Sequence, residues 1–221
     1  MRDVWAIIVA AGRGRRFGSA KQFAALKGRP VLDWTLDAFE AHPEVGGIVL
    51  VLPDEKDGAP FLGRHPKIRA VVRGGRRRED SVRRGFARVR AGAGDVVLVH
   101  DGVRPLVSRE VISRVIRAAR RGGAAIPVVP VEDTIKEVVR GKVARTVERA
   151  NLYRVQTPQG FSYAVLDKAL RRAGRKNPAA TDEAALAERA GVKVRVVEGD
   201  PGNIKVTTPS DLKIAEAFLG A

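Results

Sequence analysis

Six short apolar runs rich in β-branched residues recur along the chain, and they constrain its fold more than any other feature. The first run is apolar throughout and ends at a loop of small residues, which is typical of a strand buried on both faces of a parallel sheet. Segments with helical periodicity separate the runs. This alternation predicts an α/β fold, a Rossmann-like doubly wound and mostly parallel sheet. The predicted strands are Val4–Ala10, Gly47–Leu52, Ile68–Arg73, Val96–His100, Ala124–Val129 and Val192–Val197.

The helical segments begin at residues that suit helix N-termini. Ser108 and Thr181 are expected to act as N-caps, and Pro30 and Pro209 are expected in first turns. Each segment is long enough to return the chain across the sheet. The predicted helices are Pro30–Ala41, Ser81–Arg90, Ser108–Arg121, Ser162–Ala173, Thr181–Ala190 and Pro209–Leu219.

One stretch interrupts the alternation. Thr134–Val139 and Val143–Glu148 read as two strands joined by Arg140, Gly141 and Lys142, which predicts an inserted β-hairpin. A hairpin of two strands is only marginally stable alone, so we expect it to pack on another surface, such as a second subunit. The chain shows neither a linker-like segment nor an internal repeat. We therefore predict a single domain over residues 1–221 with a dimerisation arm at about 132–154.

The charge balance points to an anionic partner. Lys and Arg total 41 against 25 Asp and Glu, a formal net charge of +16 at pH 7. This charge is spread over every predicted helix and only 5% of residues are aromatic, so nucleic-acid binding is a distant alternative. We expect no nucleic-acid and no membrane partner, because no apolar run approaches the roughly 18–20 residues of a membrane span. A start without a signal-peptide layout predicts a cytoplasmic protein.

The chain has no cysteine, and this limits the chemistry available to it. A disulfide scaffold, a thiolate metal site and a cysteine nucleophile are all excluded. The three histidines, His42, His65 and His100, are too widely spaced for a local imidazole cluster. Any metal must therefore have oxygen ligands.

Ligands of a doubly wound sheet bind beyond the carboxyl ends of its strands, so the loops that follow the strands are candidates for the site. The first, Ala10–Lys21, combines small residues, whose amides can approach a phosphate, with cations that neutralise it. It matches neither the dinucleotide fingerprint, where Phe17 replaces the third glycine, nor a P-loop. The loop predicts a triphosphate cradle, and a tight turn with solvated arginines is the alternative.

A second candidate is the segment Arg73–Ser81, which follows a predicted strand. Its glycines can let a flat base lie against the backbone, with Ser81 expected to cap the next helix. The alternative is a basic surface turn. Asn203–Thr207 is predicted as a short strand whose Lys205 projects into the crevice, and an ordinary edge lysine is the alternative there.

The segment His100–Pro105 is the strongest candidate. Asp101 stands at the carboxyl end of a central strand, where a magnesium nucleotide would arrive, and Gly102 permits close approach. Arg104 can clamp an anion with two hydrogen bonds. The alternative is an Asp–Arg pair that closes a turn, and His100 itself is expected to be a packing residue.

These segments occur in the order found in one enzyme family. Ala10-Ala11-Gly12 to Lys21-Gln22, Gly74-Gly75 to Asp80-Ser81-Val82, His100 to Pro105, Thr157-Pro158-Gln159, Thr181-Asp182-Glu183 and Asn203 to Thr207 together resemble the 2-C-methyl-D-erythritol 4-phosphate cytidylyltransferases of the non-mevalonate isoprenoid pathway. The resemblance covers essentially the whole chain. It implies transfer of the CMP moiety of CTP to 2-C-methyl-D-erythritol 4-phosphate with release of pyrophosphate. It also implies Mg²⁺ and a homodimer whose hairpin arm reaches the partner's site.

The resemblance also implies roles for individual residues. The catalytic cations would be Arg16, Lys21 and Lys205. The nucleotide-binding residues would be Ala10, Ala11, Gly12, Gly14, Gly75, Ser81, Asp101 and Gly102, with Asp101 also near the metal. The substrate-binding residues would be Arg104, Thr134, Arg149 and Thr207, of which Thr134 and Arg149 come from the partner's arm. Arg76 and Gly202 depart from the family by replacing acidic residues.

Attack on an α-phosphoryl group suits such a set of residues. The phosphate monoester of the substrate is already a nucleophile at neutral pH, so catalysis consists mainly of positioning two anions and neutralising charge. The substrate is the least readable feature of the sequence. A related cytidylyltransferase that acts on ribitol 5-phosphate or another sugar or alditol phosphate remains the alternative, because the substrate-side residues lie on the arm.

Overall fold

The computed structural model describes residues 4–12, 14, 17–173 and 180–220. In this part of the chain one eight-stranded sheet has the order β10-β7-β11-β6-β1-β4-β5, and β12 also pairs with β7. Its strands are β1 (Val4–Val9), β4 (Val45–Leu52), β5 (Ile68–Arg73), β6 (Val96–Asp101), β7 (Ala124–Pro130), β10 (Tyr153–Val155), β11 (Gln159–Ser162) and β12 (Arg195–Glu198). The mostly parallel, doubly wound sheet predicted from the sequence is confirmed.

The order of the strands places a topological switch point between β1 and β6. β1 pairs in parallel with β4 on one side and with β6 on the other, so that Val9 stands opposite Val51 and Asp101. The chain proceeds from β1 to β4 and β5, and then crosses to β6 on the far side of β1. Connections therefore reverse beyond the carboxyl ends of β1 and β6, where doubly wound sheets bind their ligands. β10 and β11 run antiparallel to their neighbours.

Helices cover both faces of the sheet. α1 (Val31–Glu40) and α4 (Arg109–Gly122) pack on the face that carries Ile8, whereas α3 (Arg78–Phe86), α5 (Tyr163–Arg172) and α6 (Glu183–Arg189) pack on the face that carries Ile7. The alternation of Ile7 and Ile8 between two cores explains why β1 is apolar at every position. Beyond the sheet lie a short helix, α2 (Ala59–Leu62), two 3₁₀ turns, η1 (Lys21–Phe23) and η2 (Glu55–Gly58), and a two-stranded ribbon, β2 (Ala25–Leu26) with β3 (Arg29–Pro30).

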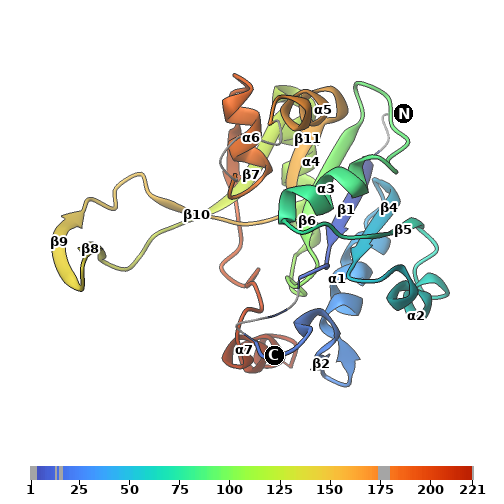
Figure 1. Ribbon diagram of the computed structural model, residues 1–221, viewed down its shortest axis with the longest axis horizontal. Helices are drawn as coiled ribbons and strands as arrows, with labels where there is room; N and C mark the ends of the chain where they lie inside the picture. Colours follow the sequence, from blue (N-terminus) through green and yellow to red (C-terminus); the bar gives the residue numbers. More distant parts are fainter. Residues whose placement is uncertain (1–3, 13, 15–16, 174–179, 221) are drawn as a thin grey trace.

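α7 (Pro209–Phe218) lies beside β2 at the lower edge of the molecule in Figure 1. Ala215 of α7 belongs to a small third apolar cluster with Leu26, Val31, Val103 and Val206. This cluster attaches the C-terminal helix next to the turn that follows β6. The end of the chain is therefore held close to the crevice.

The predicted hairpin forms an arm that projects from the body (Figure 1). β8 (Ile135–Val139) pairs antiparallel with β9 (Lys142–Val147), and Arg140 and Gly141 both have positive φ at the turn. Val138 and Val143 are 57% and 62% exposed, which is unusual for apolar strand residues. The arm thus presents apolar surface away from its own domain.

Several local predictions were wrong. Asn203–Thr207 is irregular rather than a strand, although Val206 N donates to Val103 O over 2.9 Å. α6 is capped by Asp182 rather than Thr181, since the Asp182 side chain accepts a hydrogen bond from Ala185 N. β10 and β11 were not predicted, because strands of three and four residues are too short to show a periodicity. No helix in the described residues is long and apolar enough to cross a membrane.

Candidate active site

Asp101, the last residue of β6, is the centre of a cluster of cations. The residue is only 8% exposed. Lys205 Nζ lies 2.7 Å from its Oδ2, Arg78 Nε lies 3.3 Å from its Oδ1, and Arg104 Nε lies 3.9 Å from its Oδ2. Burial opposes ionisation, but the nearby Arg78, Lys205 and Arg104 prevail and hold the pKa of Asp101 well below its usual range. The carboxylate therefore stays charged at neutral pH.

The turn after β6 packs closely on the end of β1. Gly102 N donates to Val9 O over 2.9 Å, and a Cβ on Gly102 would lie 2.8 Å from the Cβ of Ala10. Only glycine fits there without displacing β1. Arg104 N donates to Asp101 O over 3.1 Å, so Asp101 and Arg104 do close a turn, as in the alternative interpretation, and both are buried at the carboxyl end of β6. The predicted packing role of His100 is confirmed, because the residue is fully buried against the ring of Phe39.

The first loop meets the loop after β5 at the crevice. A Cβ on Gly74 would lie 2.2 Å from the Cβ of Ala11, so the two backbones are as close as two small residues allow. Gly14 has a φ of +62°, and its carbonyl oxygen accepts hydrogen bonds from Phe17 N and Gly18 N at 2.8 and 2.9 Å. These bonds bring Phe17 and Gly18 back to Gly14, and Lys21 is half-buried where the 3₁₀ turn begins. Arg16 lies outside the described residues.

Ser81 was expected to cap the helix α3, but it does not. The helix begins at Arg78, with Arg77 at the N-cap position, so Ser81 lies one turn inside. Its Oγ accepts a hydrogen bond from Gly75 N over 3.0 Å and donates to Arg77 O over 3.2 Å. Ser81 therefore holds the glycine loop against the start of the helix.

Arg78 and Glu183 were not predicted as site residues, although Glu183 belongs to one of the segments that carry the family resemblance. Arg78 Nη1 lies 2.7 and 2.6 Å from the two carboxylate oxygens of Glu183, while Arg78 Nε reaches Asp101. Glu183 is 1% exposed, and burial raises its pKa although Arg78 opposes this. The pair joins α3 and α6 to the end of β6. Glu183 follows the N-cap Asp182, but nothing in the sequence distinguishes Arg78 from its neighbours Arg76 and Arg77.

The predicted substrate-side residues fall into two groups. Arg104 lies in the cluster, and Thr207 lies at the start of α7, where its backbone N donates to Asp211 Oδ2 over 2.8 Å. Burial opposes the ionisation of Asp211, but hydrogen bonds from the backbone of Thr208 and Thr207, together with the smaller effect of the nearby Lys21 charge, hold the pKa of Asp211 below its usual value. Thr134 and Arg149, by contrast, lie exposed on the arm. Among the described residues no hydrogen bond or ion pair joins either of them to the Asp101 cluster.

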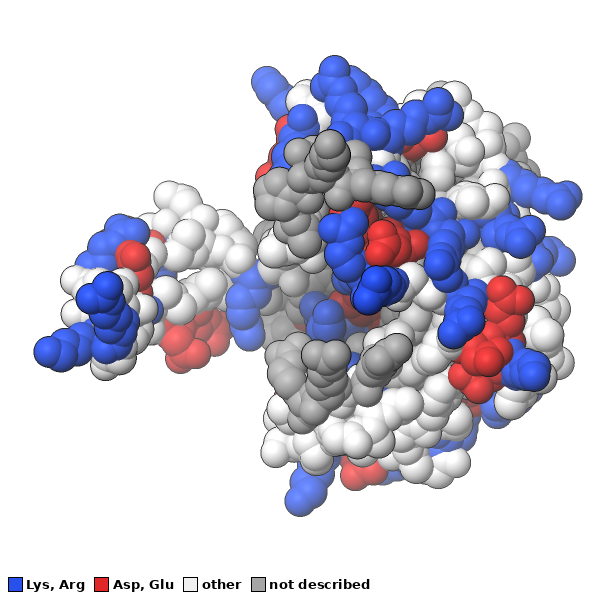
Figure 2. All heavy atoms as spheres, viewed as in Figure 1, with Lys and Arg blue, Asp and Glu red and all other residues white. Residues whose placement is uncertain are grey.

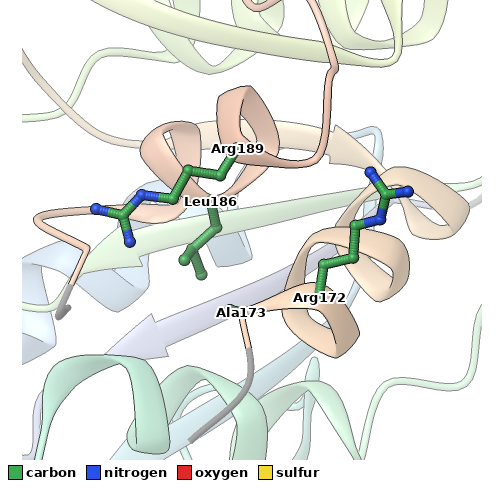
Figure 3. A pocket seen from close by; sticks show the side chains of 4 residues that line it. All are labelled: Arg172, Ala173, Leu186 and Arg189. Atoms are coloured by element: carbon green, nitrogen blue, oxygen red, sulfur yellow. The ribbon is translucent and has the colours of Figure 1, made fainter. Parts of the chain in front are cut away.

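Two of the hollows in the described surface lie outside this cluster. One, of about 460 Å³, lies at the base of the arm and includes Arg149 in its lining. The other, of about 290 Å³, lies between α5 and α6 and is lined by Arg172, Ala173, Leu186 and Arg189 (Figure 3). No residue of this second hollow belongs to the loops at the carboxyl ends of the strands. Basic side chains are spread over both body and arm on the face in Figure 2.

The donor set can be compared with the needs of a metal. Within the described ranges no three His, Asp or Glu side chains are grouped to hold an ion. In the described part of the chain, Asp101 is the carboxylate paired with both Lys205 and Arg104. A hard oxygen donor of this kind fits Mg²⁺, which usually takes one or two carboxylates and completes its coordination with substrate phosphates and water. The residues therefore fit a metal that arrives with a nucleotide.

Comparison with known proteins decides the family. The sequence model of the 2-C-methyl-D-erythritol 4-phosphate cytidylyltransferase family matches residues 4–221. The chain belongs to this family. It is 42% identical to the 2-C-methyl-D-erythritol 4-phosphate cytidylyltransferase of Geobacter metallireducens, over 98% of this chain and 97% of that protein. It is 44% identical to the Bacillus licheniformis enzyme of the same name, over 97% and 95% of the two chains.

Solved structures of cytidylyltransferases share the fold. The 2-C-methyl-D-erythritol 4-phosphate cytidylyltransferase of Thermus thermophilus superimposes with a TM-score of 0.81 at 39% identity, over 99% of this chain and all of that one. A 4-diphosphocytidyl-2C-methyl-D-erythritol synthase superimposes with a TM-score of 0.87 at 33% identity, over 99% of both chains. The family resemblance noted in the sequence is thereby confirmed, and the chain is a nucleotidyltransferase of the cytidylyltransferase type.

Proposed function

We propose that the chain transfers the CMP moiety of CTP to 2-C-methyl-D-erythritol 4-phosphate. The products are 4-diphosphocytidyl-2-C-methyl-D-erythritol and pyrophosphate. The reaction is an intermediate step of non-mevalonate isoprenoid biosynthesis. The observation that carries the proposal is the convergence of Asp101, Lys205 and Arg104 at the reversal point of the sheet, beside two glycine loops. The names of the relatives support the substrates, and a reaction that consumes CTP suits a cytoplasmic enzyme.

The small residues at the crevice suit nucleotide binding. Because Ala and Gly carry little or no side chain, these positions let a phosphate or the edge of a base approach the backbone closely. We assign the cytosine to the backbone at Gly75, which Ser81 holds, and the ribose to Asp101. The full set of proposed nucleotide contacts is Ala10, Ala11, Gly12, Gly14, Gly75, Ser81, Asp101 and Gly102.

The cations suit the chemical step. A phosphate oxygen of the substrate attacks the α-phosphorus of CTP, the new P–O bond forms, and the bond to the β-phosphate oxygen breaks as pyrophosphate leaves. No general base is needed, because the attacking phosphate is already ionised. Arg16, Lys21 and Lys205 are proposed to neutralise charge that develops on the phosphates, and preorganised cations do this without reorganising solvent. Lys205 is preorganised by its 2.7 Å contact with Asp101.

We propose that Asp101 holds Mg²⁺. The metal, when bound, neutralises the triphosphate and orients the leaving pyrophosphate. Arg78, fixed by Glu183, keeps the Asp101 carboxylate ionised and oriented toward the crevice. The chain therefore maintains an oxygen donor in the charged form that a hard cation requires.

We further propose a homodimer in which the arm completes the partner's site. Exposed apolar side chains on β8, β9 and β10, among them Val138, Val143 and Tyr153, form a surface that a second copy would bury. Thr134 and Arg149 would then contact the substrate held by Arg104 and Thr207 of the other subunit. The hollow at the arm base is consistent with this use of Arg149.

The test is pyrophosphate release by the purified protein with Mg²⁺. CTP is compared with UTP and ATP, and 2-C-methyl-D-erythritol 4-phosphate with ribitol 5-phosphate and simple sugar phosphates. Lys21→Ala is the inactive control for contaminating enzymes. We expect turnover with CTP and 2-C-methyl-D-erythritol 4-phosphate, at a kcat/KM well above that of every other pair. A preference for ribitol 5-phosphate would replace the proposed substrate, and no release with any pair would refute the activity.

A further inference from the structure

The loop that leads to Lys205 is held against the body by the side chain of Gln156. This side chain is buried, and the oxygen and nitrogen of its amide bind the backbone N–H and C=O of Asp200. Asp200 N donates to Gln156 Oε1 over 3.1 Å, and Gln156 Nε2 donates to Asp200 O over 2.7 Å. A Cβ on Gly199 would lie 2.6 Å from Gln156 Oε1, so the loop has no room to carry a side chain at that point.

Asn203 provides a second attachment of the same loop. It is fully buried, and its Nδ2 donates to Thr157 O over 2.9 Å. Its carbonyl oxygen accepts a hydrogen bond from Arg104 Nη1 over 2.7 Å. Gly199 N still donates to Val128 O of β7 over 2.8 Å. Residues 200–205 have no strand partners, so side chains from residues 104, 156 and 203 replace the hydrogen bonds that a sheet would supply.

Thr157, the residue after Gln156, holds Asp101, which is the acidic partner of Lys205. Thr157 Oγ1 accepts a hydrogen bond from Asp101 N over 3.1 Å and lies 3.0 Å from His100 Nδ1. Burial lowers the pKa of His100 to about 3, so the imidazole is neutral. Its Nε2 lies 3.4 Å from Arg104 O, which can only accept, so Nε2 carries the proton and Nδ1 accepts from the Thr157 hydroxyl. Two consecutive residues therefore anchor the acid, through Thr157, and the loop of Lys205, through Gln156.

We propose that Gln156 is a positioning residue for Lys205. By holding Asp200, it sets where the ammonium group stands beside Asp101 and hence beside the phosphates of CTP. The inference rests on the proposed function, in which Lys205 neutralises charge in the transition state. Displacing a catalytic group by about 1 Å can cost about 100-fold in rate, so the position of such a group matters as much as its charge.

Gln156→Met tests the proposal, because methionine has a similar length and shape but no amide. We measure kcat and KM for CTP with this change in the parent and in Lys205→Ala. Turnover should fall about 10- to 100-fold with Lys205 present and less than about twofold without it, since groups that act through one another are not additive. Equal falls in the two backgrounds would assign Gln156 a general structural role and overturn the proposal. Parental turnover of Gln156→Met alone or of Lys205→Ala alone would also overturn it.

Ser113→Ala is the matched control. Ser113 Oγ lies 2.9 Å from Nε2 of the buried His42, so this change also removes a hydrogen bond to a buried side chain, but one outside the site. We expect a comparable loss of thermal stability with unchanged turnover. Should Gln156→Met fail to fold, Gln156→Asn supplies the same comparison, since it keeps the amide but is one methylene shorter.

Hydrogen exchange tests the clamp without any substrate. In Gln156→Met the Asp200 amide should exchange at least about tenfold faster, whereas amides of β1 keep their protection. Unchanged exchange at Asp200 would overturn the proposal even if turnover fell. A parent chain that releases no pyrophosphate would refute the proposed function, and the exchange result would still decide whether Gln156 holds the loop.

Discussion

Removal of the Arg78 side chain is expected to destabilise the native state strongly, through Glu183. Glu183 is 1% exposed, and Arg78 is its hydrogen-bonding partner in the described structure. Asp101, the other partner of Arg78, keeps Lys205 and Arg104. Removing one member of a buried ion pair typically costs about 3–5 kcal/mol, because the remaining charge is uncompensated. The Arg78 side chain is 29% exposed, which places Arg78→Met near the lower end of that range.

Burial of Glu183 gives this loss a pH dependence of known sign. Burial raises the pKa of Glu183 above its ordinary value of 4.5, so protonation favours the native state. That contribution is complete below the ordinary pKa and is lost as the pH rises through the raised pKa. Loss of Arg78 raises the pKa of Glu183 further. Arg78→Met should therefore be most destabilised at pH 7 and should recover part of its stability near pH 5.

Urea unfolding of four proteins at both pH values measures these effects. The parent, Arg78→Met, Glu183→Gln and the double variant form a thermodynamic cycle. Glu183→Gln should destabilise the parent, which loses an ion pair, yet stabilise Arg78→Met at pH 7, where it removes an unpaired buried charge. If the two single effects simply add, or if Arg78→Met loses less than about 1 kcal/mol at pH 7, the Arg78–Glu183 pair does not have the energetic role that its geometry implies.

Three other results are expected. Lys21→Ala should lower the rate of pyrophosphate release by about 10²–10³ with little change in melting temperature, as for loss of one preorganised charged group, and near-parental turnover would remove Lys21 from the mechanism. The pKa of Asp33 is lowered, because hydrogen bonds from His65 and Arg29 outweigh the effect of burial, so its stabilisation is present above the ordinary pKa and is lost as the pH falls through the lowered pKa. Asp33→Asn should therefore reduce the loss of unfolding free energy at acid pH, measured by urea unfolding, and an unchanged loss would contradict this. Mixing Arg149→Ala with Lys21→Ala chains under subunit exchange should restore about a quarter of the sites, and confirmed heterodimers without activity would exclude Arg149 from the partner's site.

The amino-acid sequence by itself determined the layers of the fold and the loops of the site. Strands such as Val4–Val9 are apolar over their length because both faces are covered, and that signal is local. Ser108 marked the start of α4 because a cap acts on amides only three residues away. Glycine loops after β1 and β5 were recognisable because close backbone approach excludes side chains. Signals of this kind survive without any knowledge of distant contacts.

The tertiary structure alone decided which charges meet. Arg78 follows two other arginines, and its partner Glu183 is 105 positions away, so neither local pattern nor composition singles it out. Asn203–Thr207 has strand-like residues but does not join the sheet, and buried side chains hold it instead. The role of Gln156 likewise depends on a loop 44 positions further along the chain. The hydrophobic periodicity of a segment indicates which residues are buried. The hydrogen-bond partner of a buried residue depends instead on how distant segments pack, and this packing arranges the charges of the site.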